Sequence, residues 1–320
     1  MDEVLTGIRA VHIASTVMLV GALAFRVLVA EPAVRSSNVE PPTLTAIRKA
    51  LARLAWIALA VAVLSGATWF IQVAATIGGQ TPIEALSTDT GWIVLTETQF
   101  GQNSLVRLAA AALVGGTLPI AYRGDGAGLS GWRWLPASIA GGLLASLAWT
   151  GHSGATPGPA GDLNLASDAL HILAAGVWVG GLAPLALFLA AAGRHGGDGW
   201  ALIAEKATRR FSSLGILSVG TLIITGIVNS WILVGSFAAL VGTDYGRLLM
   251  LKVGLFAAML GFASVNRWRL TPRLMQAQRQ EAALRGLTRN SIIELGLGLI
   301  IFVVVGALGT MHPAVHLMPR

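Results

Sequence analysis

Cysteine is absent from this chain of 320 residues, which excludes thiolate metal ligands, disulfide bonds and cysteine nucleophiles. The chain also lacks a GxxxxGK[ST] loop, so we expect it to hydrolyse no nucleotide and not to be an enzyme. Charged residues make up only 12% of the chain, against about 25% in a soluble domain. Together with 54% hydrophobic residues, this shortage of charge is typical of a membrane protein.

The apolar residues gather in long stretches. A membrane-spanning helix needs about 20 of them, because a helix rises about 1.5 Å per residue through a hydrocarbon core of about 30 Å. Backbone groups in lipid must bond within their own segment, so stretches of this length indicate helices rather than barrel strands. Eight segments qualify: 8–30, 52–77, 103–122, 134–152, 166–192, 211–236, 246–266 and 290–311. The sequence therefore predicts an all-α, polytopic membrane protein with eight transmembrane helices.

Lysine and arginine gather in every second connection between these segments. The odd-numbered connections hold Arg35, Arg48, Lys49, Arg53, Arg123, Arg133, Arg194, Lys206, Arg209, Arg210, Arg267, Arg269, Arg273, Arg279, Arg285 and Arg289. Such connections face the cytoplasm, so both termini are predicted to lie outside. The net charge of +7 mostly reflects this bias, and we expect no nucleic acid partner.

The two halves of the chain repeat one another. Residues 98–101 (TQFG) precede Arg107 as residues 243–246 (TDYG) precede Lys252, with the cation six residues after the glycine each time. A hydroxyl residue before a glycine also recurs, in Ser65-Gly66 and Thr225-Gly226. Four helices are an even number, so the second copy enters the membrane in the same orientation as the first. The predicted parallel four-helix repeats are 1–155 and 156–320.

Four histidines follow this repeat. His12 and His171 are 159 residues apart, near the outer ends of the first and fifth spans, and His152 and His312 are 160 apart, closing the fourth and eighth. Imidazole binds metal ions and haem iron, so four histidines on one side of a membrane predict a site. Asp168 lies three residues before His171, where it could orient the ring or cap its helix.

Histidine and methionine alternate in the C-terminal tail. Met311, His316 and Met318 surround Pro313, where we expect the helix to break and the tail to fray. Thioether selects Cu(I), while imidazole suits copper in either oxidation state as well as zinc and nickel. This composition favours copper and adds these three residues to the candidate metal ligands.

The segments GHSGATPG, DALHILAAGVWVGGL, TDYGRLLMLKVGLF, VNRWRLTPRL and GTMHPAVH resemble the copper resistance protein D family of inner-membrane proteins. The resemblance covers nearly the whole chain. It implies a multi-pass protein of the bacterial inner membrane that moves copper toward the cytoplasm. It also implies copper-site roles for His12, His152, His171 and His312, and a periplasmic copper-binding partner of the copper resistance protein C type.

Two cations lie within the predicted spans. Arg107 and Lys252 fall in the outer third of their helices, where ionised groups are costly. We expect them to pair with carboxylates such as Glu97 or Asp244, or with loop carbonyls, in a structural role.

Glu294, near the inner end of the last span, and two asparagines have two interpretations. Glu294, Asn266 and Asn229 could line an exit path, although a polar residue near a helix end is more often structural.

Two functions remain open at this stage. In the first, outer histidines capture copper and the bundle passes it inward without nucleotide hydrolysis. In the second, each half holds a b-type haem between two histidines, His12 with His152 and His171 with His312, for electron transfer. The positions of His152 and His312 at helix ends, the methionines of the tail and the family resemblance all favour copper.

Overall fold

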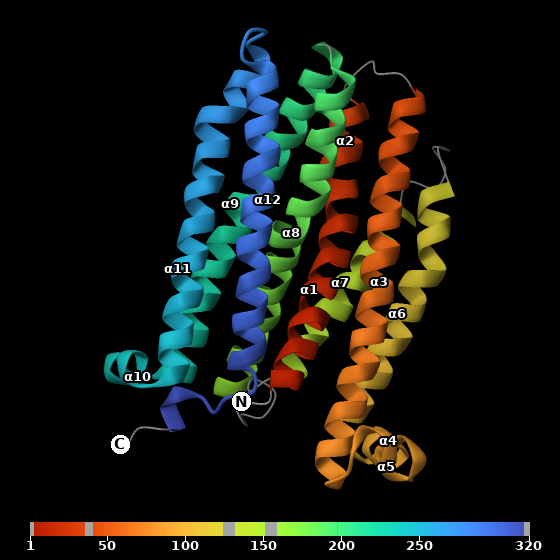
Figure 1. Ribbon diagram of the computed structural model, residues 1–320, viewed down its shortest axis with the longest axis vertical. Helices are drawn as coiled ribbons and strands as arrows, with labels where there is room; N and C mark the ends of the chain where they lie inside the picture. Colours follow the sequence, from red (N-terminus) through yellow and green to blue (C-terminus); the bar gives the residue numbers. More distant parts are fainter. Residues whose placement is uncertain (1–2, 36–40, 124–131, 151–158, 197, 317–320) are drawn as a thin grey trace.

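The computed structural model describes residues 3–35, 41–123, 132–150, 159–196 and 198–316 (Figure 1). This described part is helical and contains no strand. Seven helical stretches in it are long and apolar enough to cross a membrane. They are α1 (Glu3–Phe25) with η1 (Arg26–Ala30) and α2 (Glu31–Arg35), α3 (Pro41–Gly78), α6 (Gln99–Arg123), α8 (Pro159–His195), α9 (Asp198–Val234), α11 (Asp244–Val265) with η5 (Asn266–Leu270) and η6 (Thr271–Met275), and α12 (Gln280–Leu308). The prediction of an all-α membrane protein is confirmed.

The predicted span 134–152 is a shorter helical stretch. It consists of α7 (Leu135–Ala145), of 11 residues, and the 3₁₀ helix η3 (Ser146–Thr150), of 5 residues. Both α3 and α9 run toward the end of the bundle that carries the short helices α4 and α10, so the chain must return to that end between α6 and α8 (Figure 1). The α7–η3 stretch lies on this return. Its length leaves it outside the seven candidate spans, so the count of eight stays a prediction.

The bundle has two distinct ends. The beginning of α1, the end of α12 and the short helices α4 (Pro82–Ser87), α5 (Thr90–Glu97) and α10 (Phe237–Gly242) lie at one end, which we call the α10 end (Figure 1). The opposite end, with α2, we call the α2 end. The predicted cytoplasmic connections lie at the α2 end, so loop charge predicts that the α10 end faces outward.

The short helices at the α10 end are held by hydroxyl caps. Thr81 Oγ1 accepts from the backbone N–H of Glu84 at 3.3 Å, and the backbone N–H of Thr81 donates to Glu84 Oε2 at 2.8 Å, a capping box that begins α4. The bonds that the backbone N–H and the hydroxyl of Thr81 donate to the Glu84 carboxylate hold its pKa below its ordinary value. The two repeated motifs are capped alike, because Thr98 and Thr243 each accept at 3.0 Å from the N–H of the glycine three residues later.

Helices α1 and α8 form the centre of the bundle and are its most buried spans. Their backbones touch, since a Cβ added to Gly180 would overlap the carbonyl oxygen of Val17 and a Cβ on Gly21 would overlap the backbone of Gly180. A Cβ on Gly176 would strike the side chains of Leu144 and Val20. The sequence predicts this close packing from the small-xxx-small spacing of Gly176 and Gly180. The outer helices expose leucine, isoleucine and valine around this centre, as lipid-facing helices do.

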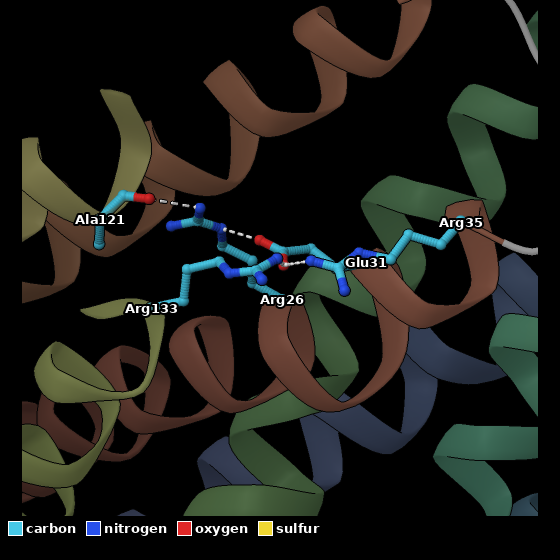
Figure 2. Close-up of polar contacts among 5 residues, drawn as sticks. All are labelled: Arg26, Glu31, Arg35, Ala121 and Arg133. Atoms are coloured by element: carbon cyan, nitrogen blue, oxygen red, sulfur yellow. Dashed lines mark hydrogen bonds and ion pairs between the residues drawn. The ribbon is translucent and has the colours of Figure 1, made fainter. Parts of the chain in front are cut away.

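A buried ion-pair network joins α1 to α6 and α7 at the α2 end (Figure 2). Arg26, only 4% exposed, begins the π-helical turn η1. Its Nε donates to Glu31 Oε1 at 2.9 Å, its Nη2 donates to the Ala121 carbonyl at 2.6 Å, and its guanidinium stacks 3.7 Å from the Tyr122 ring centroid. Arg133 donates to Glu31 Oε2 at 2.6 Å. Sequence reasoning did not identify this network, which fixes the segment leading into α7.

The tail beyond α12 packs against the bundle as far as it is described. Ala314 is fully buried, and the 3₁₀ turn η7 (Ala314–His316) contacts α9, where Val315 lies against Gly235. Gly235 has a φ of +73°, a conformation that glycine adopts without strain. The expectation that the tail frays directly after Pro313 is therefore wrong for residues 313–315, because the turn at Gly235 provides a surface for them.

Candidate functional site

His12 and His171 occupy similar environments in the half of the bundle nearer the α10 end. His12 of α1 faces α3, with its Nδ1 3.1 Å from Ser65 Oγ. His171 of α8 faces α9, with its Nδ1 2.9 Å from Thr225 Oγ1. His12 is 5% exposed and His171 is half-buried. Each ring also lies against the glycine that follows the hydroxyl residue, Gly66 or Gly226.

The hydroxyls fix the tautomer of both rings. Ser65 Oγ donates to the Val61 carbonyl at 2.6 Å, and Thr225 Oγ1 donates to the Thr221 carbonyl at 2.6 Å. A hydroxyl has one proton, so each of these oxygens can only accept from the imidazole. Nδ1 therefore carries the ring proton in both histidines, and Nε2 keeps the lone pair with which imidazole binds metals.

The two Nε2 atoms differ in their surroundings. Arg107 Nη2 of α6 contacts Nε2 of His12, and because guanidinium can only donate, it uses the lone pair. Lys252 of α11 is close enough to His171 to interact with it electrostatically. Among the described residues, no hydrogen bond reaches Nε2 of His171. The second ring is thus the one with a lone pair available to a ligand.

A carboxylate lies beside the second ring. Asn229 Nδ2 donates to Asp168 Oδ1 at 3.5 Å, and Asp168 also interacts electrostatically with Lys252 and Tyr245. The side chain that bonds the imidazole of His171 is Thr225, which the repeat of a hydroxyl before glycine could have identified from the sequence. Asn229 does not join Glu294 and Asn266 in the exit path considered from the sequence, because α9 carries Asn229 to Asp168, in the half of the bundle nearer the α10 end.

The predicted pairing of the two cations also needs correction. Asp244 pairs with Arg247 at 3.3 Å instead of with Lys252, which lies near Asp168. Arg107 contacts a histidine, and Glu97 forms no ion pair with it. Arg107 of α6 thus reaches His12 of α1, and Lys252 of α11 lies close enough to His171 of α8 to interact with it electrostatically.

Of the other predicted ligands, Met311 and His312 lie just beyond the end of α12. His312 is exposed, and Met311 packs against the apolar cluster around Tyr245 and Leu308. His316 is in η7, but its side chain is not described; His152 and Met318 lie outside the described residues. The described part of the chain brings no three histidine or carboxylate side chains together at metal-binding distance.

A second polar cluster lies between α11 and α12, toward the α2 end. Asn266 Nδ2 donates to Glu294 Oε1 at 2.7 Å, and Asn290 Nδ2 donates to Asn266 Oδ1 at 2.8 Å. Glu294 is 1% exposed. Met259, fully buried, lies against Gly298, one helical turn from Glu294 toward the α10 end. These contacts join the predicted Asn266 and Glu294, and they add Asn290.

The fold and these contacts define a polytopic α-helical membrane protein with two intramembrane histidines, each bonded by a hydroxyl of the next helix. The chain belongs to the copper resistance protein D family. Residues 205–308 match the family described as "Copper resistance protein D", and residues 1–162 match "Copper resistance protein D-like, N-terminal domain". The resemblance seen in the sequence is thereby confirmed.

Three curated relatives are similar to this chain. It is 32% identical to "Copper resistance protein D" of Pseudomonas syringae pv. tomato, over 69% of this chain and 71% of the relative. It is 30% identical to "Copper transport protein CutJ" of Bacillus subtilis, over 54% of this chain and 31% of the relative. It is 29% identical to "Inner membrane protein YebZ" of Escherichia coli, over 52% of this chain and 55% of the relative. No solved structure matches the chain. The matches and the seven apolar helices fit a multi-pass inner-membrane protein, as the sequence predicts.

Proposed function

We propose that this protein carries copper across the bacterial inner membrane, from the periplasm toward the cytoplasm, without nucleotide hydrolysis. Family membership and the printed names of two relatives, a copper resistance protein and a copper transport protein, support a copper-related function. The single observation that carries the proposal is the Nε2 lone pair of His171, in a ring that Thr225 fixes from the other side.

The second half of the chain offers a negative charge and a hydrogen-bond acceptor, the groups that a bound cation needs. Asp168 supplies a negative charge near His171, and Asn229 Oδ1 is a buried acceptor that no described residue hydrogen-bonds. A copper ion bound to Nε2 would therefore meet further acceptors, with Asp168 shielding it from Lys252. We assign the first intramembrane copper position to His171, with Asp168 beside it.

The outer end would capture the ion. His152, His312, His316, Met311 and Met318 are the candidate ligands there, and their imidazole and thioether groups suit copper. His12 is a copper ligand in this proposal only when Arg107 releases its Nε2. The two halves then hold one position each, and a periplasmic protein of the copper resistance protein C type would deliver the ion.

The path inward would pass Met259 and then Glu294. Met259 offers a thioether, a soft ligand for Cu(I), one helical turn before the Glu294 carboxylate. The carboxylate and its asparagine neighbours then lead toward the α2 end.

Copper uptake into proteoliposomes tests this function. His171→Ala should reduce the initial uptake rate at least tenfold, because it removes the ligand atom. His195→Ala is the matched control, since this exposed histidine at the end of α8 stacks on Trp200, far from the site. Equal uptake by the wild type, the control and His171→Ala would remove His171 from the path.

Haem binding is the alternative function. The buried cations beside both histidines favour it, because arginine and lysine bind carboxylates such as haem propionates. An absorbance spectrum of the purified protein separates the two. We expect no Soret band; a Soret band with a pyridine haemochrome signal would replace copper transport by electron transfer.

A further inference from the structure

Two guanidinium groups meet around one buried indole in the first half of the chain. The Cζ atoms of Arg9 and Arg107 lie 4.9 and 5.4 Å from the ring centroid of Trp69, which is 3% exposed. Arg107 itself is 8% exposed. The His12 ring packs edge-on against the same indole at 5.6 Å between centroids. The four side chains come from α1, α3 and α6 and form one cluster, the Trp69 cluster.

Within the part of the chain that the structure describes, no anion balances the positive charge of the Trp69 cluster. Among the described residues, no carboxylate lies within ion-pair distance of Arg9 or Arg107. Cation–π contact stabilises each guanidinium by about 0.5–2 kcal/mol, less than the several kcal/mol that burying a charge costs. A partner of opposite charge is therefore the missing element of this cluster.

Two unpartnered atoms of the cluster, and a third one helical turn away along α6, are donors. Nε of Arg9, Nε of Arg107 and Nδ2 of Asn103 are buried and have no hydrogen-bond partner among the described residues. Asn103 lies one turn before Arg107 on α6, on the same face of the helix. Guanidinium and amide N–H groups cannot satisfy one another, so all three need an acceptor.

The end of α12 does not supply that acceptor for Arg107. The guanidinium of Arg9 lies against Gly309, which follows α12, where the negative end of the helix dipole partly offsets its charge. Arg107 instead donates Nη2 to the neutral ring of His12 and leaves its Nε directed at no acceptor.

The corresponding positions of the second half have the opposite polarity. Counting by the offsets of the repeat, Arg9 corresponds to Asp168 and Trp69 to Asn229. There the unpartnered atom is an acceptor, Asn229 Oδ1, and a carboxylate accompanies the cation. One half of the chain is arranged for a cation and the other for an anion.

We propose that the Trp69 cluster binds a small monovalent anion, a halide or a short carboxylate, between Arg9, Arg107 and Asn103. The bound anion accepts from the three unpartnered N–H groups and neutralises one of the two guanidinium charges. It also lowers the positive potential at the α10 end of the bundle. The three groups that would hold the anion, those of Arg9, Arg107 and Asn103, are not among the proposed copper ligands, so the anion site is a proposal separate from copper transport.

Bromide quenching of Trp69 fluorescence tests the site directly. Bromide quenches indole on contact, and Trp69 is too buried for collisions from solvent. Titration of the full-length, copper-free protein with bromide in methanesulfonate buffer, at constant ionic strength, should give a saturable component. Trp69→Phe should abolish this component, and chloride and acetate should compete with it.

Variants assign the saturable component to the cluster. Arg107→Gln and Arg9→Gln should each weaken bromide binding at least tenfold, whereas Arg247→Gln, an exposed arginine at the same end, should leave it unchanged. If either arginine variant does not fold, Asn103→Leu keeps both charges and should weaken binding severalfold.

Linear quenching that is equal in the wild type and Trp69→Phe would overturn the proposal. So would a Soret band, since haem propionates would then be the anions. Neither result depends on copper uptake, so a failed transport assay leaves the anion site standing.

Discussion

At the residue scale, the most informative detail is the hydroxyl group of the neighbouring helix that bonds Nδ1 of each histidine. Ser65 and Thr225 each donate their single hydroxyl proton to a carbonyl of their own helix. Each hydroxyl oxygen can then only accept from Nδ1–H, so the two rings have the same tautomer. The chemistry then diverges at Nε2, which faces Arg107 in one half and is without a hydrogen-bond partner among described residues in the other. Ring orientation is shared by the two halves, while the ligand each half can accept differs.

Thr225 can be exchanged to test this role. Thr225→Val keeps the shape but removes the acceptor for Nδ1–H, so copper affinity at His171 should fall about 10–100-fold. Thr225→Ser restores the hydroxyl found at Ser65 and should restore affinity. A copper titration of the purified protein checks both variants. Equal affinity in the valine and serine variants would show that the hydroxyl does not orient the ring.

At the scale of elements, the crossing of α1 and α8 decides where both histidines lie. Gly21 and Gly180 let the two backbones touch, which no larger residue would permit. From this crossing, α1 turns His12 toward α3 and α8 turns His171 toward α9. The rings therefore occupy separate environments on different sides of the central pair. This arrangement favours one position in each half over a single shared site.

Gly180→Ala should disturb this crossing. The added Cβ would overlap the Val17 carbonyl, and overpacking of this kind costs about 1–3 kcal/mol, more than the ~1 kcal/mol gained in helix propensity. Thermal unfolding in detergent measures the effect. Gly254→Ala is the control, because a Cβ there meets no atom within 4 Å, and it should be neutral or stabilising. A Gly180→Ala protein as stable as the control would contradict the close crossing.

At the scale of the whole molecule, the two ends carry different chemistry. Caps, short helices and the candidate ligands that the structure describes lie toward the α10 end, whereas arginines gather at the α2 end. The Arg26–Glu31 network belongs to the second group and ties the first helix to the entry of α7 (Figure 2). Loop charge predicts that the α2 end faces the cytoplasm.

The absence of cysteine makes this topology easy to measure. Single cysteines at Ser87 in α4 and at Gln278 before α12 are both exposed, at opposite ends. A membrane-impermeant maleimide added to intact spheroplasts should label Ser87→Cys and leave Gln278→Cys unlabelled until the cells are lysed. The unchanged chain is the control for background labelling. The reverse labelling pattern would mean that the α10 end faces the cytoplasm, and it would contradict the proposed direction of transport.

The sequence by itself determined the class of the protein, its long helices and the residues that recur in both halves. Lipid imposes the length of a spanning helix, and a repeat preserves residue identity, so both can be read from the sequence. Only the tertiary structure decided which side chains meet. In a bundle surrounded by lipid, buried and exposed helix faces are both apolar, so periodicity does not show which face turns inward. The contact of Arg107 with His12, the position of Asn229 beside Asp168 and the Arg26 network therefore depend on how the helices pack, above all on the glycine crossing of α1 and α8.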